Sequence, residues 1–175
     1  MIEIECIGKD MNLEELTNKI IEWGAEKGIY ENSTYQHQLN KTLEEITELH
    51  KAIIGNNVDK IKDAIGDIYV TLVMAGQFDK RASKAIKEAF YADVDIVEST
   101  SLFEFSFLLL SVSSAIDPTQ TQARVRRLQF IGMINRLNRI SGKYNLDLKG
   151  CVEHAYNVIS KRTGKMIDGQ FVKDE

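Results

Sequence analysis

Hydrophobic residues recur every three or four positions along most of the chain, which is the spacing of one face of an α-helix. The clearest stripe covers residues 34–54, and similar stripes follow Asn12, follow Asp59 and cover residues 80–91. Each stripe predicts an amphipathic helix that buries one side. At residues 2–6 apolar side chains alternate with glutamates, a pattern typical of a short edge strand or an extended arm.

Residues 101–116 differ from the other stripes, because apolar side chains occur on nearly every side of the predicted helix. Such a helix is expected to be buried within a bundle or at a subunit interface. A long basic helix is predicted to follow at about 119–142, closed by Gly142. Asp147 then caps a last predicted helix that runs to about residue 162, and a turn and a short extended tail begin near Gly164.

The composition supports a helical fold. Pro118 is the single proline in 175 residues, so almost nothing in the chain breaks a helix. Hydrophobic residues make up 43% and charged residues 27%, which is ordinary for a globular protein and excludes a disordered polymer. The predicted fold class is therefore all-α.

The start of the chain has no basic and apolar signal sequence, and no apolar run reaches the roughly 20 residues that span a bilayer. Cys6 and Cys151 lie far apart and are interpreted as reduced thiols. We therefore expect a cytoplasmic protein that does not associate with a membrane.

Charge is unevenly distributed along the chain. Residues 118–143 carry six basic residues and no acidic one, so with a total of −4 the remainder has a net charge of −10. This polarity fits an acidic site for cations and a basic surface for anions. Arg124, Arg126 and Arg127 could contact nucleic acid, but no aromatic residues are interleaved with them, so we do not expect a nucleic-acid partner.

Acidic residues cluster at helical spacing on two consecutive predicted helices. Glu45 and Glu48 share one face of the first helix, and Glu44 lies one turn before Glu48. Asp63 and Asp67 share one face of the next helix. If the two helices form a hairpin, these like charges repel one another, and a hard divalent cation such as Mg²⁺ would remove the repulsion. The alternative is that they form solvated faces, because glutamate is a good helix former.

Asp67 and Gly66 favour a site over a solvated face. Aspartate is a poor helix former, yet Asp67 directly precedes an apolar run that is expected to be half-buried. Glycine inside a helix costs about 1 kcal/mol relative to alanine, unless a backbone or a ligand approaches closely.

Several segments resemble those of a known family. On the two helices they read Gln38-x-x-Lys41-x-x-Glu44-Glu45-x-x-Glu48-Leu49 and Asp63-Ala64-Ile65-Gly66-Asp67, and in the tail Ala155-Tyr156-Asn157-x-x-x-x-Arg162-x-Gly164-Lys165. In this order and spacing the chain resembles the MazG-like all-α NTP pyrophosphohydrolases, particularly the short phage-type members. The resemblance covers about 12–79 and 146–173, and residues 80–145 form a helical insertion without a recognised counterpart.

The resemblance implies a single helical-bundle domain over residues 1–175 that hydrolyses a nucleoside triphosphate to monophosphate and pyrophosphate. The family holds Mg²⁺ with ExxE on one helix and ExxD on the next. Glu45 and Glu48 match the first motif, and Asp67 matches the end of the second. Ala64 stands where the family has glutamate, and Asp63 is the candidate to replace it as a metal ligand.

The remaining candidate residues would handle water and substrate. Glu44 is the candidate to orient or deprotonate the attacking water, or else to act as a further ligand. Phosphate contacts are expected from Lys41, Arg162 and Lys165. Gln38 and Asn157 are expected to position the nucleotide. Trp23 could stack on a base, although an aromatic residue on an apolar helical stripe is more often part of the core.

The resemblance also implies a homodimer, because members of the family build a four-helix core from two subunits. The apolar stretch 103–110 would form an unusually large exposed patch on a monomer, so we expect the insertion to lie in or beside the interface. Alternatively, the insertion completes the bundle within one chain. Two other functions stay open: a catalytically weak nucleotide-binding or interaction module, which Ala64 keeps possible, and a purely structural helical protein.

Overall fold

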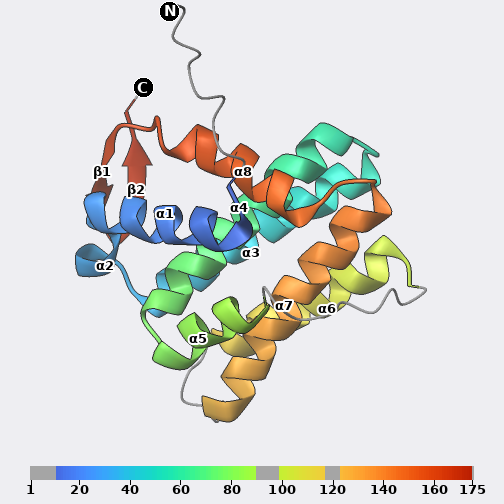
Figure 1. Cartoon of the computed structure of the whole chain (residues 1–175), viewed down its shortest axis with the longest axis horizontal. Helices are drawn as coiled ribbons and strands as arrows, with labels where there is room; N and C mark the ends of the chain where they lie inside the picture. Colours follow the sequence, from blue (N-terminus) through green and yellow to red (C-terminus); the bar gives the residue numbers. More distant parts are fainter. Residues whose placement is uncertain (1–10, 90–98, 117–122, 175) are drawn as a thin grey trace, which may run out of the picture.

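Eight helices and one β-hairpin make up the described part of the chain, which comprises residues 11–89, 99–116 and 123–174 of a computed structural model (Figure 1). The predominance of helix confirms the all-α prediction. The strand or arm expected at 2–6 and the expected start of the basic helix lie outside the described residues. In chain order the elements are α1 (Leu13–Glu26), α2 (Ile29–Asn32), α3 (Tyr35–Ile54), α4 (Val58–Gln77), α5 (Lys80–Ala89), α6 (Ser101–Ala115), α7 (Ala123–Lys143), α8 (Leu148–Ile159), β1 (Gly164–Ile167) and β2 (Gln170–Lys173).

Polar residues that flank the apolar stripes set the ends of the helices. The Asn12 side chain accepts a hydrogen bond from the Glu15 backbone at 2.9 Å, and the Glu15 carboxylate accepts one from the Asn12 backbone at 3.0 Å. This reciprocal pair is a capping box at the start of α1. The predicted Asp147 cap is confirmed, because its carboxylate accepts a hydrogen bond from the backbone of Gly150 at 2.7 Å.

The end of α7 differs slightly from the prediction. Gly142 does not close the helix, which continues to Lys143. The chain turns instead at Asn145, whose φ of 55° lies in the left-handed region that asparagine tolerates better than most residues. Gly142 therefore predicted the end of the helix to within one residue, but the chain turns at Asn145.

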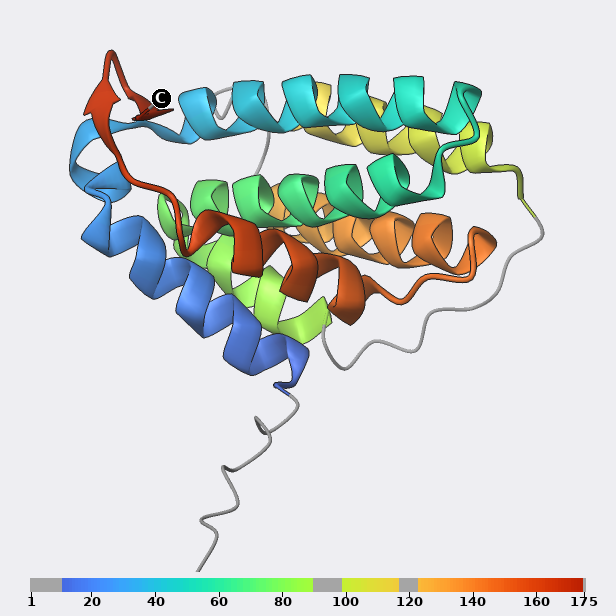
Figure 2. The same ribbon diagram turned by 90° about the horizontal axis from the view of Figure 1, so that it is seen from above.

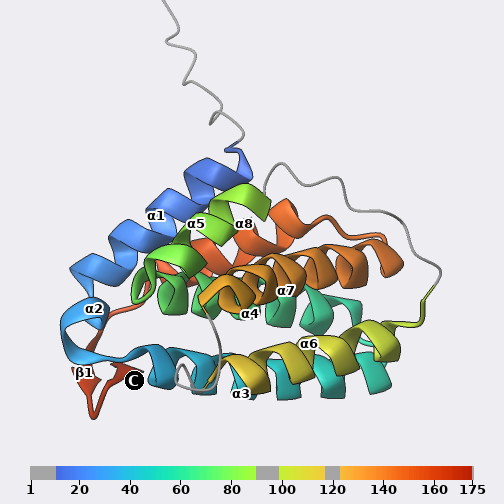
Figure 3. The ribbon, with the colours of Figure 1, turned by 90° about the horizontal axis from the view of Figure 1, so that it is seen from below.

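The long helices form a closed ring of contacts: α3 packs on α4, α4 on α7, α7 on α6 and α6 on α3. Figures 2 and 3 show three layers, with α3 beside α6, then α4 beside α7, then α1, α5 and α8. The central α4 is the most deeply buried helix, and Ile65, Tyr69 and Leu72 are fully enclosed. Helices α6 and α7 belong to the insertion. Together with α3 and α4 they complete a four-helix core within one chain.

Within the chain, α6 is buried on one side only, so the expected burial inside a bundle is met in part. Phe105, Leu108 and Val112 are buried against the neighbouring helices, but five large apolar side chains of this helix stay exposed. The reason is the position of α6 at a corner of the ring, where α3 and α7 cover only one of its sides. The exposed residues are Leu102, Phe103, Phe107, Leu109 and Leu110.

Glu104 is the one charged residue of α6, and it is only 1% exposed. Its carboxylate accepts hydrogen bonds from the Ser99 hydroxyl at 2.6 Å and from the Arg136 guanidinium at 2.9 Å. Arg139 lies 3.8 Å away on the same helix, α7. A buried carboxylate is tolerated when it is paired in this way, so Glu104 fixes how α6 lies on α7.

Other basic residues of α7 also face carboxylates of the same chain. Arg126 contacts Asp79 at 3.0 Å, and Arg127 contacts Glu88 of α5 at 2.6 Å. Two of the basic residues of α7 are therefore neutralised by ion pairs within the chain, one to the α4–α5 loop and one to Glu88 of α5.

Gly66 allows α8 to approach α4 closely. A Cβ atom at this position would overlap the carbonyl oxygen of Cys151 and the side chain of Ala155. The close approach expected from the sequence is thus made by a backbone rather than by a ligand. This contact brings the end of α8, and with it Arg162, towards Asp67.

The tail forms a hairpin, in which β1 and β2 pair antiparallel. The two-residue turn consists of Asp168 and Gly169, with φ values of 48° and 79°. An Asp-Gly pair is favoured in this type of turn because both residues adopt positive φ. Gly169 also packs directly on the ring of His37, where a Cβ atom would overlap it. The predicted turn and extended tail are present, and the hairpin is anchored against α3.

None of the helices in the described segments has the combined length and apolar character that crossing a bilayer would require.

Candidate functional site

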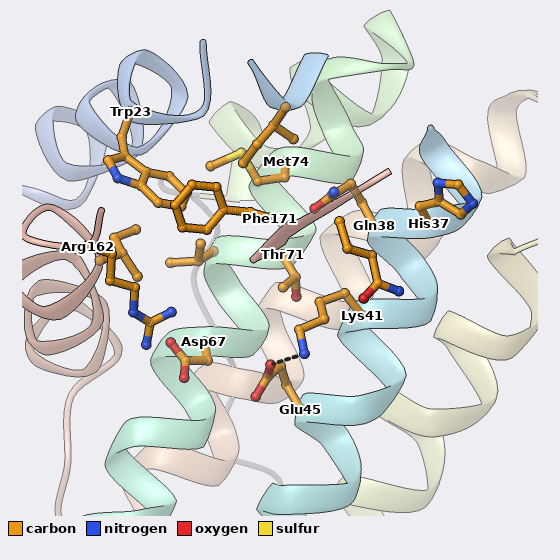
Figure 4. A pocket seen from close by; sticks show the side chains of 14 residues that line it. Trp23, His37, Gln38, Lys41, Glu45, Asp67, Thr71, Met74, Arg162 and Phe171 are labelled. Atoms are coloured by element: carbon orange, nitrogen blue, oxygen red, sulfur yellow. Dashed lines mark ion pairs between the residues drawn. The ribbon is translucent and has the colours of Figure 1, made fainter. Parts of the chain in front are cut away.

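A pocket of about 150 Å³ opens where α1, α3, α4, the end of α8 and the tail hairpin meet (Figure 4). One wall is apolar and consists of Trp23, Ile29, Val70, Met74, Ile159 and Phe171. The other wall is polar and consists of His37, Gln38, Lys41, Glu45, Asp67, Thr71, Arg162 and Gln170. The pocket therefore joins an aromatic, apolar surface to two carboxylates and two cations.

The apolar wall depends on a contact between the first helix and the last strand. The rings of Trp23 on α1 and Phe171 on β2 lie 5.6 Å apart at 69°, which is a favourable edge-to-face arrangement. Trp23 is buried and also lines the pocket, so it serves the core and the site together. Phe171 was not predicted as a pocket residue, although it belongs to the tail segment in which the chain resembles the family.

Glu45 and Asp67 face the pocket from α3 and α4. Burial raises the pKa of Glu45 to about 7, and the Asp67 charge adds to this, while Lys41 opposes it. Burial also raises the pKa of Asp67 to about 6, and the Asp63 charge adds to this, while Arg162 opposes it. The two carboxylates therefore hold their protons more tightly than exposed ones do.

Lys41 lies between the carboxylates of its own helix. Its ammonium contacts Glu44 at 2.6 Å and Glu45 at 3.5 Å. Burial by itself would lower the pKa of Lys41. The two glutamates together have the larger effect, so the pKa of Lys41 is raised. Figure 4 shows its ammonium pointing at Glu45, with the Arg162 guanidinium on the other side of Asp67. Both cations are thus placed to meet an anionic ligand in the pocket.

Glu48 and Asp63 do not enter this pocket. Both are exposed and line a second, more open hollow at the turn between α3 and α4. Residues three or four apart share a face of a helix but lie about 5 Å apart along its axis. The four predicted metal ligands consequently form a row along the seam between α3 and α4, with Glu45 and Asp67 at one end and Glu48 and Asp63 at the other.

The row of carboxylates does not form a compact cluster of metal ligands in the described part of the chain. Across residues 11–89, 99–116 and 123–174, no three acidic, histidine or cysteine side chains are placed together as ligands. The donor chemistry nevertheless suits Mg²⁺, which prefers carboxylate oxygens. The charge of Glu48 raises the pKa of both Glu45 and Asp67, so the row carries a repulsion that a divalent cation would relieve.

Three other predicted residues lie outside the pocket. Glu44 is exposed and paired with Lys41. Asn157 projects from the outer side of α8, because Cys151, Ala155 and Ile159 occupy its buried side. Lys165 is exposed because alternate residues of β1 point outwards. Of the predicted substrate-binding residues, the structure brings together Gln38, Lys41 and Arg162.

Comparison with known proteins assigns no family. No protein-family model matches the chain, and no solved structure matches it. A curated relative is an uncharacterized 18.2 kDa protein from the rep-hol intergenic region of Haemophilus phage HP1 (strain HP1c1), which is 38% identical over 63 residues. The match spans 36% of this chain and 39% of the length of the phage protein. It therefore relates only a part of the two chains.

Proposed function

We propose that this protein is a cytoplasmic, Mg²⁺-dependent nucleoside triphosphate pyrophosphohydrolase of the MazG-like type, which converts a (d)NTP to the nucleoside monophosphate and pyrophosphate. One observation carries the proposal: an apolar aromatic pocket adjoins a row of carboxylates and two cations. Bases favour aromatic and apolar surroundings, phosphates favour cations, and hard divalent ions favour carboxylates. The resemblance in the order of these residues supports the same assignment.

The nucleoside would occupy the pocket beside Trp23 and Phe171. On the opposite wall, the Gln38 amide donates a hydrogen bond to the Ser33 hydroxyl at 2.9 Å. This bond fixes the amide, and its oxygen is left to accept a hydrogen bond from the ligand. A buried polar group with a fixed orientation is suited to position a substrate rather than only to bind it.

The metal would be held by Glu45, Glu48 and Asp67, with Asp63 as a fourth or outer ligand. Mg²⁺, when bound, lowers the pKa of the attacking water and stabilises negative charge on the phosphoryl oxygens. Without it the carboxylates would repel the substrate, whose phosphates carry the same sign of charge.

The residues of the chain supply the remaining steps. Lys41 and Arg162 bind phosphate oxygens and hold the α-phosphorus towards the carboxylate row. The oxygen of water forms a bond to that phosphorus, and the bond to the oxygen bridging the α- and β-phosphates breaks. Glu44 accepts the proton from the water, after exchanging its contact with Lys41, and pyrophosphate leaves.

A panel of canonical and modified dNTPs and NTPs, assayed for pyrophosphate with Mg²⁺ and with a chelator, tests this proposal. We expect Mg²⁺-dependent release from at least one member, and a loss of at least about 100-fold in the Glu48→Gln variant, which is the effect of removing a major electrostatic group. Full activity of that variant, or activity in the chelator, would contradict the assignment of the metal site.

A second candidate is a nucleotide-binding module with little turnover. Two observations favour it: Ala64 replaces the expected fourth ligand, and the described carboxylates are spread along a seam rather than gathered at one point. Such a module would be stabilised by nucleotide and Mg²⁺ without releasing pyrophosphate. A purely structural protein would show neither effect.

We also propose that the protein forms a homodimer through α6. The four-helix core is closed within one chain, so a partner subunit is not needed to complete the bundle. The dimer is proposed instead because of the exposed apolar residues of α6. Phe103, Phe107 and Leu110, at helical spacing, form an outer stripe on α6 that is 51%, 39% and 63% exposed. An apolar stripe of this kind is typical of a surface that another protein covers, and a second copy of the chain would bury it.

A further inference from the structure

The second hollow, at the turn between α3 and α4, contains charged residues to which the catalytic proposal gives no role. It has a volume of about 480 Å³ and is open to solvent. Its charged lining consists of Glu48 and Lys51 from α3 and of Lys60 and Asp63 from α4. Two of these residues belong to the carboxylate row, so the hollow continues directly from the proposed metal site.

Polar, acidic and basic residues follow one another in a defined order along the seam between α3 and α4. Gln38 and Lys41 lie at the pocket end, Glu45 and Glu48 follow, and Lys51 lies at the turn end. On the antiparallel α4 the order runs from Thr71 through the aspartates to Lys60. From Glu45 to Lys51 the helix rises by about 9 Å, which a triphosphate chain and an extended lysine side chain can bridge together.

Lys51 and Lys60 differ from Lys41 in their surroundings. Lys41 is held by two glutamates, whereas neither Lys51 nor Lys60 forms an ion pair with any residue that the structure describes. The Asn57 side chain accepts a hydrogen bond from the Lys60 backbone at 3.1 Å, which fixes the first turn of α4. The two lysines thus project from fixed positions and keep their ammonium groups available to an anion.

We propose that this hollow is a pyrophosphate subsite, in which Lys51 and Lys60 bind the β- and γ-phosphates of the substrate. The inference rests on the proposed function and adds a direction to it: the nucleoside lies in the pocket and pyrophosphate leaves at the turn. The charges of the two lysines are balanced by Glu48 and Asp63, so the hollow attracts pyrophosphate only when a divalent cation accompanies it.

Calorimetric titration of the full chain with pyrophosphate, and separately with a nucleoside monophosphate, tests the subsite. Both titrations are made with and without Mg²⁺, and pyrophosphate is expected to bind only with it. Replacing either lysine by glutamine should weaken the binding of pyrophosphate by about 10-fold, and replacing both by about 100-fold, because charge-assisted contacts to the anion are lost. Binding of the monophosphate should change less than about 2-fold, since its phosphate lies nearer Lys41.

Two further variants separate charge from structural damage. Lys51→Arg combined with Lys60→Arg should retain most of the binding of pyrophosphate, because arginine also binds phosphate. Lys87→Gln removes an exposed lysine from α5 and should have no effect. The subsite is refuted if the double glutamine variant binds Mg²⁺-pyrophosphate as wild type does, or if wild type does not bind it. Failure of the proposed function is seen separately, as absence of pyrophosphate release in the nucleotide panel.

Discussion

Replacing Glu45 by glutamine should stabilise the protein when Mg²⁺ is absent. Glu45 is half-buried on α3, and burial, with the Asp67 charge, raises its pKa from 4.5 to about 7. At the usual 1.36 kcal/mol per pKa unit, this displacement corresponds to about 3 kcal/mol of destabilisation of the ionised form. The repulsion is shared with Asp67, and glutamine loses the contact with Lys41, so we expect a net gain of about 1–3 kcal/mol at pH 8.

The gain should depend on pH in a definite direction. Because the folded-state pKa of Glu45 is raised, its proton contributes stability that is fully present below pH 4.5 and is lost as the pH rises through about 7. Metal-free wild type should therefore lose stability relative to Glu45→Gln between pH 5 and pH 8. For a chain of 175 residues, the expected gain at pH 8 corresponds to a Tm about 3–10 °C higher for the variant, and the difference should nearly vanish at pH 5.

Thermal unfolding in a chelator, followed by circular dichroism at both pH values, measures this difference. Glu22→Gln, on the exposed side of α1, is the matched control and should leave the Tm nearly unchanged. Addition of Mg²⁺ should reverse the order, since wild type gains stability by binding the ion and the variant does not. A variant that is no more stable than wild type at pH 8 would refute the idea that Glu45 belongs to a row of repelling carboxylates.

Three further predictions follow from the contacts. Glu104→Gln should destabilise the protein by about 3–5 kcal/mol in chemical denaturation, because two arginines lose a buried partner; a loss below about 1 kcal/mol would contradict this. If Asp63 replaces the missing family glutamate, Asp63→Asn should weaken Mg²⁺ binding, measured by calorimetry, as severely as Asp67→Asn, whereas a small effect would leave three protein ligands. Leu110→Glu should convert a dimer of about twice 19.9 kDa into a monomer in light scattering, and Val158→Glu, which alters an exposed apolar residue of α8, should not; a wild-type monomer would refute the dimer.

The periodicity of the sequence predicts most of the helices because each buries one face. The stripes after Asn12 and Asp59 and over 34–54 all correspond to helices, and the cap at Asp147 is present. The sequence did not show which sides of the apolar α6 are covered within the chain, since hydrophobicity alone does not tell where the neighbours of a helix lie. That depends on the placement of α3 and α7, which contact α6 across long stretches of sequence.

Helix faces predicted part of the site, and the resemblance predicted Arg162, which lies on another element. Lys41 and Glu45 lie one turn apart, so their common direction follows from helical geometry. The meeting of Trp23 with Phe171 does not, because it depends on how the tail hairpin docks. The sequence also could not predict that the carboxylates are divided between two hollows. This division depends on where Asp63 lies relative to the α3–α4 turn.

The central claim is tested most directly by ³¹P NMR of a nucleoside triphosphate incubated with the full-length chain and Mg²⁺. A pyrophosphohydrolase acting at the α-phosphorus produces nucleoside monophosphate and pyrophosphate in equal amounts, and the Glu48→Gln variant should produce both at least about 100-fold more slowly. Release of orthophosphate with nucleoside diphosphate would place the attack at the γ-phosphorus and contradict the account. So would a triphosphate that stays intact for every base in the panel while the protein remains folded.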